Sequence, residues 1–154
     1  MEFTRNGANH QLSWASYSSS AADWLQMNFM SPKLIVAIET KGRPDTSDGL
    51  QFVKTYKAQY STDGVNWTPI DNGRVFQANT DVINKVRNDL YSNVIATSVR
   101  ILPQTWNTWA SMKLDVLFQD LYIDCSSSSS SLAYAFNWTP FPAILIALVF
   151  YALY

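Results

Sequence analysis

Cysteine and histidine are nearly missing from this 154-residue chain, which has one of each, Cys125 and His10. A structural zinc site needs about four cysteine or histidine ligands, and an internal disulfide needs two cysteines, so the sequence excludes both. His10 has no recognisable nucleophile partner, and no nucleophile elbow, P-loop, dinucleotide fingerprint or His-Glu-x-x-His motif occurs. The sequence therefore predicts a protein that is not an enzyme.

An excess of either charge is also lacking. The 11 basic and 12 acidic residues leave a net charge of −1. Nucleic-acid binding needs a clustered basic face, so no nucleic-acid partner is expected. The length suits one domain with a real core better than two.

What the chain does have is a series of short segments in which apolar and polar residues alternate. Residues 52–60 precede an Asp63-Gly64 turn and a further such segment, which is a strong hairpin signal. Helical periodicity is weak throughout and comes nearest at residues 82–90. Strands are expected at residues 24–29, 33–39, 52–60, 66–70, 75–77, 94–102 and 112–118. This spacing predicts an all-β fold, an antiparallel β-sandwich or jelly-roll barrel.

The composition changes near residue 118. Residues 1–118 are expected to form the domain, residues 119–131 a serine-rich linker, and residues 132–154 a hydrophobic tail. The tail fits a GPI-attachment signal, a membrane anchor, or a stretch translated past the true exon end. No signal peptide is expected, because the first residues hold no apolar core. A GPI signal would therefore imply that the true start is missing.

Several segments follow one another in the order of a known family. They are Ser13-Trp14-Ala15-Ser16, Trp24-Leu25-Gln26-Met27-Asn28-Phe29, Ile38-Glu39-Thr40-Lys41-Gly42-Arg43, residues 52–67, residues 75–81 and residues 99–106. Over residues 9–117 the chain resembles the F5/8 type C, or discoidin, domain family. The resemblance implies a discoidin-like sandwich of the galactose-binding-domain type that binds ligands without catalysis.

The resemblance is incomplete at both ends. Family members usually start further upstream, with a cysteine bonded to another at the end of the last strand. Cys125 lies too far along the chain to match that second cysteine. We therefore expect the domain to be truncated at its N-terminus, with opening strands absent and neighbouring backbone unpaired.

The resemblance also implies a role in recognition and cell adhesion, outside the cell or at its surface. The expected partners are cell-surface glycans or proteins, bound by loops at one end of the sandwich. Two alternatives stay open: a peripheral module for anionic phospholipid, and a carbohydrate-binding appendage of a secreted enzyme. The tail is a candidate for membrane contact.

Two loops supply the candidate binding residues. The first is polar and acidic, which suits sugar hydroxyls and repels anionic lipid. The second offers an aromatic ring that can stack on a sugar or dip into lipid, although lone exposed apolar residues are often without function. The expected ligand-binding residues are Arg43, Asp45, Asp48, Asn107, Thr108 and Trp109. The alternative for the first loop is an ordinary solvated turn.

Other positions give weaker indications. Asp115 stands where calcium-holding members of the wider fold often carry a carboxylate, which indicates a structural calcium ligand; the alternative is a surface or ion-paired aspartate. No other cofactor is indicated. Asn66 and Asn137 open glycosylation acceptor triplets. The tryptophans expected in the core are Trp14, Trp24, Trp67 and Trp106.

Overall fold

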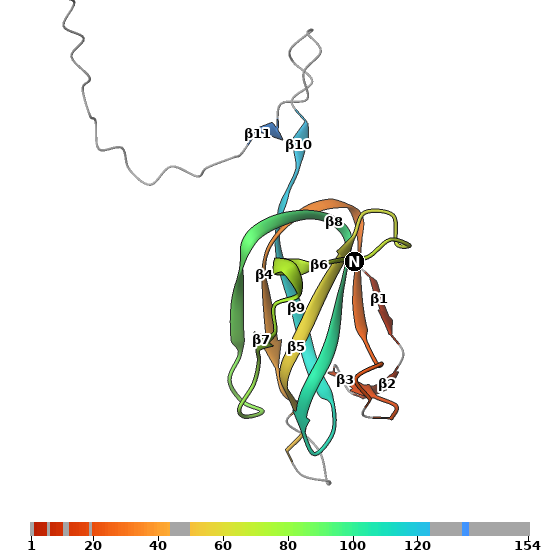
Figure 1. Cartoon of the computed structure of the whole chain (residues 1–154), viewed down its shortest axis with the longest axis vertical. Helices are drawn as coiled ribbons and strands as arrows, with labels where there is room; N and C mark the ends of the chain where they lie inside the picture. Colours follow the sequence, from red (N-terminus) through yellow and green to blue (C-terminus); the bar gives the residue numbers. More distant parts are fainter. Residues whose placement is uncertain are drawn as a thin grey trace, which may run out of the picture. The chain divides into compact units, whose positions relative to one another are not determined.

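Two long strands, β4 (Leu25–Lys41) and β8 (Val86–Asn107), organise the fold (Figure 1). They pair antiparallel along most of their length, from Leu25 opposite Ile101 to Thr40 opposite Val86. The register shifts between Asn28 and Lys33, where both strands arch over at the top of Figure 1. Each strand therefore contributes its two halves to two different faces of the domain.

The computed structural model describes residues 2–5, 7–10, 13–18, 20–43, 50–123 and 134–135. It divides the chain into two compact units, Met1–Leu121 and Tyr122–Tyr154. Besides β4 and β8, the first unit contains β1 (Glu2–Arg5), β2 (Gly7–His10), β3 (Ser13–Ser16), β5 (Phe52–Ser61), β6 (Thr68–Pro69), the 3-10 turn η1 (Ile70–Gly73), β7 (Phe76–Gln77) and β9 (Ser111–Asp120).

The strands are hydrogen-bonded in one continuous nine-stranded sheet, which folds over into two layers that share β4 and β8, called here the first and the second sheet. The first sheet joins β1, the start of β4, the end of β8, β5, and then β6 and β7. The second joins the start of β8, the end of β4, β9, β3 and β2. All these pairings are antiparallel, so the expected all-β antiparallel sandwich is confirmed.

The core lies between the sheets because alternate side chains of each strand point inward. Met27 of β4, Ile101 of β8 and Tyr56 of β5 are almost completely buried. The Tyr56 ring stacks on Phe76 with centroids 5.1 Å apart. Burial raises the pKa of the Tyr56 hydroxyl, although a hydrogen bond from Asn88 Nδ2 (3.3 Å) opposes this. The tyrosine is therefore a neutral core residue.

The backbone at the start of β4 is paired, although the sequence predicts unpaired backbone beside missing opening strands. Its residues 25–28 pair with β1, from Leu25 opposite Arg5 to Asn28 opposite Glu2. The expectation that missing opening strands leave this backbone unpaired is therefore wrong for these residues. No alternating pattern marks β1, because a four-residue edge strand is too short to show one.

Strand lengths also differ from the expectation. The predicted strands at 24–29 and 33–39 are two parts of β4, and residues 86–90 belong to β8 together with the predicted strand at 94–102. The predicted strand at 66–70 shrinks to β6, because the Asp63 carboxylate holds the backbone N–H groups of Val65 and Asn66 and η1 starts at Ile70. In β4, a bulge or irregularity between Asn28 and Lys33 interrupts the alternation without ending the strand. At β6, the Asp63 side chain competes with the sheet for backbone donors and shortens the strand.

The second unit is described only in part. Within it β10 (Tyr122–Ile123) pairs with β11 (Tyr134–Ala135). Strand β9 reaches Asp120, two residues into the predicted linker, and most of the linker and tail lie outside the described residues. Among the residues the structure describes, no helix has the length and apolar character needed to cross a membrane.

Candidate functional site

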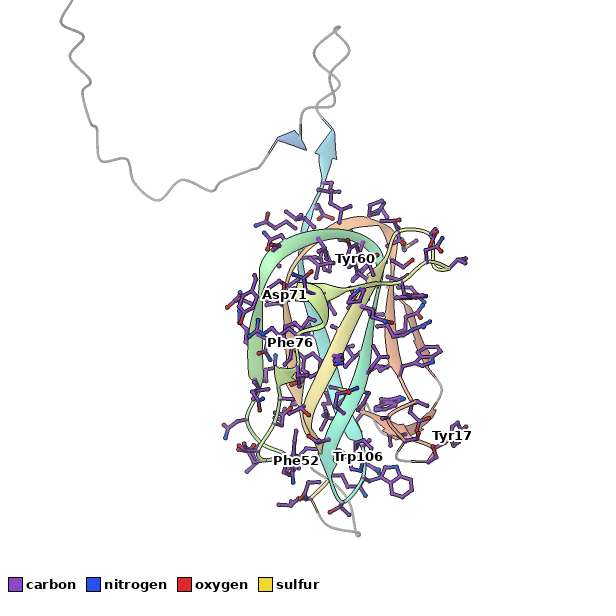
Figure 2. All side chains as sticks on the ribbon, in the orientation of Figure 1. Tyr17, Phe52, Tyr60, Asp71, Phe76 and Trp106 are labelled. Carbon is purple, nitrogen blue, oxygen red and sulfur yellow. The ribbon has the colours of Figure 1, made fainter. Side chains whose placement is uncertain are left out.

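Several loops come together at the lower end of the domain in Figure 2, where Tyr17, Phe52 and Trp106 are labelled. We call this set the loop rim. It comprises residues 17, 18 and 20–23 between β3 and β4, the two described ends of the β4–β5 loop at residues 43 and 50, residues 78–85 before β8, and residues 107–110 between β8 and β9.

Trp109 is fixed in the β8–β9 loop by one hydrogen bond from its backbone and one from its side chain. Its backbone N–H donates to the carbonyl of Asn107 (2.5 Å), and Thr108 turns the chain with a φ of 55°. The indole Nε1 donates to the carbonyl of Ser16 on β3 (2.7 Å). The ring remains 37% exposed, so it is a positioned surface aromatic and not a core residue.

Asn107 and Arg43 connect this loop with the β4–β5 loop. The Asn107 amide Nδ2 donates to the carbonyl of Leu50 (2.7 Å) and to Thr108 Oγ1 (3.3 Å). Arg43 pairs with Gln51 through its backbone N–H (2.9 Å) and through Nη1 to Oε1 (3.4 Å). These bonds bring together four of the six predicted residues, Arg43, Asn107, Thr108 and Trp109. Asp45 and Asp48 lie outside the described residues.

The β3–β4 loop was not expected to contribute to the site. The buried carboxylate of Asp23 accepts hydrogen bonds from the Ser16 hydroxyl, from Ser18 Oγ (3.1 Å) and from the backbone N–H groups of Ser18 and Ser20 (both 3.4 Å). Burial alone would raise the pKa of Asp23, but these hydrogen bonds outweigh it and lower the pKa. The ionised carboxylate thus shapes a loop that presents Tyr17, 72% exposed.

Gly42 brings the 78–85 loop to the same end. A Cβ atom on Gly42 would lie 2.8 Å from Val82 Cα and 2.9 Å from the carbonyl oxygen of Asp81, so only glycine fits this approach. Val82 is buried there, whereas Ile83 beside it is 72% exposed. Packing at Gly42 thus sets where Ile83 is displayed.

The rim therefore displays more apolar surface than its sequence suggested. Tyr17, Leu50, Ile83 and Trp109 are all exposed large hydrophobic residues. They sit in loops, where no alternation marks them, so sequence reasoning found Trp109 alone. Apolar faces beside amide, hydroxyl and guanidinium donors can stack on a ring while hydrogen-bonding its substituents.

The predicted metal ligand and the described glycosylation position lie outside the loop rim. Asp115 is exposed on β9 opposite Glu39 of β4, and the described residues hold no cluster of three or more potential metal ligands. Asn66 is exposed, with its side chain donating to Asp63 Oδ2 (2.7 Å), and Asn137 lies outside the described residues.

The tryptophan expectation is half right. Trp14 belongs to the buried core, and Trp106 packs against it. Trp24 and Trp67 lie outside the buried cluster, and both rings stack on the guanidinium of Arg100. The expectation of a core position is wrong for these two, because they occupy the outer face of the first sheet.

Among known proteins, the chain is similar to lactadherin of Rattus norvegicus, with 34% identity over 107 residues that cover 68% of this chain and 25% of that protein. It is similar to human neuropilin-2, with 29% identity over 87% of this chain and 16% of that protein. The chain thus spans about a quarter or less of these relatives.

Solved structures with a similar fold are also known. Discoidin II of Dictyostelium discoideum superposes with a TM-score of 0.66 and 31% identity, covering 74% of this chain and 44% of that chain. A Clostridium perfringens module, CBM32-5, solved with GalNAc-β-1,3-galactose, shares the fold with a TM-score of 0.51 and 17% identity, over 61% of this chain and 64% of that one. The F5/8 type C domain model matches residues 3–115, and this protein therefore belongs to the F5/8 type C domain family.

Proposed function

We propose that this domain is a non-catalytic recognition module, at the cell surface or outside the cell, that binds glycans or protein ligands through the loop rim. The observation that carries the proposal is Trp109, whose indole is held by Ser16 while more than a third of its surface stays exposed. A ring held in one orientation loses little entropy on binding, which favours stacking on a flat ligand face.

The surroundings of Trp109 support a ligand with hydroxyl groups. Thr108 is exposed next to it, and Arg43 is half-buried at the base of the neighbouring loop. These side chains offer hydroxyl and guanidinium groups, which suit the mixed donors and acceptors of a sugar. The similar fold solved with GalNAc-β-1,3-galactose makes that disaccharide a reasonable first probe.

A glycan array followed by calorimetric titration of the best ligand tests the proposal. Trp109→Ala should weaken binding by about 1 kcal/mol or more, roughly fivefold or greater, while the thermal midpoint barely changes. Val65→Ala is the matched control, because Val65 is exposed on the β5–β6 loop outside the rim. A large fall in the midpoint of Trp109→Ala would show a structural role and overturn the assignment.

Phospholipid binding is the second candidate, favoured by the four exposed apolar side chains of the rim, Tyr17, Leu50, Ile83 and Trp109. The net charge of −1 opposes attraction to an anionic surface. We therefore expect weak co-sedimentation with phosphatidylserine vesicles. Strong, salt-sensitive sedimentation that Trp109→Ala abolishes would instead favour the lipid over the glycan.

A further inference from the structure

An arginine on the outer face of the first sheet lies against two indole rings. The guanidinium carbon of Arg100 is 4.2 Å from the ring centroid of Trp24 and 3.9 Å from that of Trp67. We call these three residues the indole clamp. Arg100 is half-buried in β8, and both tryptophans are also half-buried.

Strand register explains why the rings meet this arginine. Trp24 precedes Leu25, which pairs with Ile101, so Trp24 approaches from the Leu102 side of Arg100. Trp67 precedes Thr68, which pairs with Tyr60 and through it with Val99, so Trp67 approaches from the other side. The two rings therefore flank the guanidinium along the strand and leave its outer edge as the approach for a ligand.

Polar side chains continue from the clamp across the sheet. Nε and Nη2 of Arg100 donate to Gln26 Oε1 (3.2 and 2.8 Å). Gln26 Nε2 donates to Asn28 Oδ1 (2.6 Å), which also accepts from Ser98 Oγ (2.9 Å). This network orients the guanidinium but satisfies it with a neutral amide oxygen.

A second arginine, Arg74, differs from Arg100 in its ion pairing. Arg74 lies between the rings of Phe76 (4.6 Å) and Tyr91 (4.2 Å), and its Nη1 is 3.4 Å from Asp71 Oδ2. Arg100 forms no ion pair with any residue in the part of the chain that the structure describes. Burial lowers the pKa of Arg100, which is the effect of desolvation without a compensating carboxylate.

We propose that the indole clamp is a second binding site, separate from the loop rim, for the carboxylate of a uronic-acid-containing glycan. The carboxylate accepts hydrogen bonds from the Nη1 and Nη2 N–H groups of Arg100 that Gln26 does not engage, and it supplies a counter-charge that no described residue provides. The pyranose ring lies against an indole face that the guanidinium does not cover, because this electron-rich face attracts the slightly positive C–H groups of the sugar. Exposed Lys57 on β5, which pairs with Leu102, adds positive charge on the Trp24 side.

A glycan suits this site better than an acidic peptide. The indoles offer flat apolar surface next to the cation, and half-buried Gln59, opposite Arg100, adds an amide for ring hydroxyls. A peptide carboxylate on a flexible side chain would use the arginine but not the rings. The charge and the ring surface together therefore select an acidic sugar.

The test is a titration of the ¹⁵N-labelled full chain with a short oligogalacturonate, followed by NMR at the Arg100 Nε–H and the Trp24 and Trp67 Nε1–H. Saturable shifts at all three groups are expected from the wild-type protein, so the result does not depend on a variant folding. The methyl-esterified oligomer, which keeps the rings and loses the charge, should bind at least tenfold more weakly.

Two variants complete the test. Arg100→Lys keeps the charge but loses the planar donor edge and should weaken binding at least tenfold, whereas Arg74→Lys should leave affinity unchanged. Trp109→Ala should also leave it unchanged, which separates this site from the loop rim. The proposal is overturned by absent or non-saturable shifts, by equal affinity for the methyl ester, or by equal affinity for poly-L-glutamate.

Discussion

Two turns of this protein have the same hydrogen bonds and different surroundings. In residues 63–66, Asp63 Oδ1 accepts from the backbone N–H groups of Val65 and Asn66, both at 2.8 Å, and Oδ2 accepts from Asn66 Nδ2 at 2.7 Å. In residues 81–84 the corresponding distances are 2.8, 2.7 and 2.8 Å. An aspartate followed three residues later by an asparagine thus builds one local structure twice.

The packing of the two turns differs. Gly64, the second residue of the first turn, has open space where a Cβ would stand, and Val65 is 78% exposed. Val82, the second residue of the other turn, is 6% exposed and touches the position where Gly42 would carry a Cβ. Local hydrogen bonding therefore shapes both turns, while tertiary packing anchors the second alone.

The largest effect is expected from Gly42→Ala. Its Cβ would meet backbone atoms of residues 81 and 82, which cannot rotate away, so we expect a loss of about 3 kcal/mol in the free energy of unfolding. Gly64→Ala is the control and should cost about 1 kcal/mol, from its φ of +75° without any clash. Urea unfolding measures both, and equal losses would contradict the difference in anchoring.

Truncation of the valines comes next. Val82→Ala should cost about 2 kcal/mol, because two buried methyl groups are lost and a cavity is left. Val65→Ala should change the free energy of unfolding by less than about 0.5 kcal/mol, because its side chain is already in solvent. Thermal unfolding of both variants provides the measurement, and a costly Val65→Ala would show that the first turn is anchored after all.

Acid should destabilise the 63–66 turn more than the 81–84 turn, which is the reverse of the order expected for the glycine and valine substitutions. Backbone and side-chain hydrogen bonds from Asn66 lower the pKa of Asp63, and those from Asn84 lower the pKa of Asp81. The stabilisation is complete above the unfolded aspartate pKa of about 3.9 and is lost as pH falls through each folded value. Asp63→Asn and Asp81→Asn should each flatten the decline of the thermal midpoint below about pH 4. We expect the larger effect for Asp63, and an unchanged acid profile in both variants would contradict this account.

The smallest effects should be alike in the two turns. Asn66→Ala and Asn84→Ala each remove one exposed side-chain donor from an aspartate that keeps its backbone donors. Both should cost less than about 1 kcal/mol and agree within about 0.5 kcal/mol, as exposed polar changes usually do. Chemical denaturation decides this, and a clear inequality would mean that the matching distances hide different energies.

The two turns also show how much the sequence could predict. The Asp63-Gly64 hairpin was predicted because its signals are local. The anchoring of the other turn was not predicted, since it depends on Gly42, which is distant in sequence. Likewise Trp24 and Trp67 were placed in the core, because alternation cannot tell which face of a sheet holds a stacking arginine.

The arrangement of the candidate loops could be predicted only in part. The bonds of Asn107 to Leu50 and of Arg43 to Gln51 connect the two loops, and the role of these residues in binding stays a prediction. The serines that precede Asp23 are a sequence signal for the loop that displays Tyr17, because serine side chains are typical donors to a carboxylate nearby in the chain. Leu50 and Ile83 carry no comparable signal, since their exposure results from the packing of other segments.

The sharing of β4 and β8 between the sheets has a consequence for how the chain folds. Neither sheet can form without a strand of the other, and Leu25 must find Ile101 before their pairing brings any stabilisation. Closing so long a stretch of chain costs entropy before contacts repay it, so folding should take on the order of milliseconds to seconds. Hydrogen exchange at β4 and β8 should then report only global opening, because no smaller unit contains both halves of either strand.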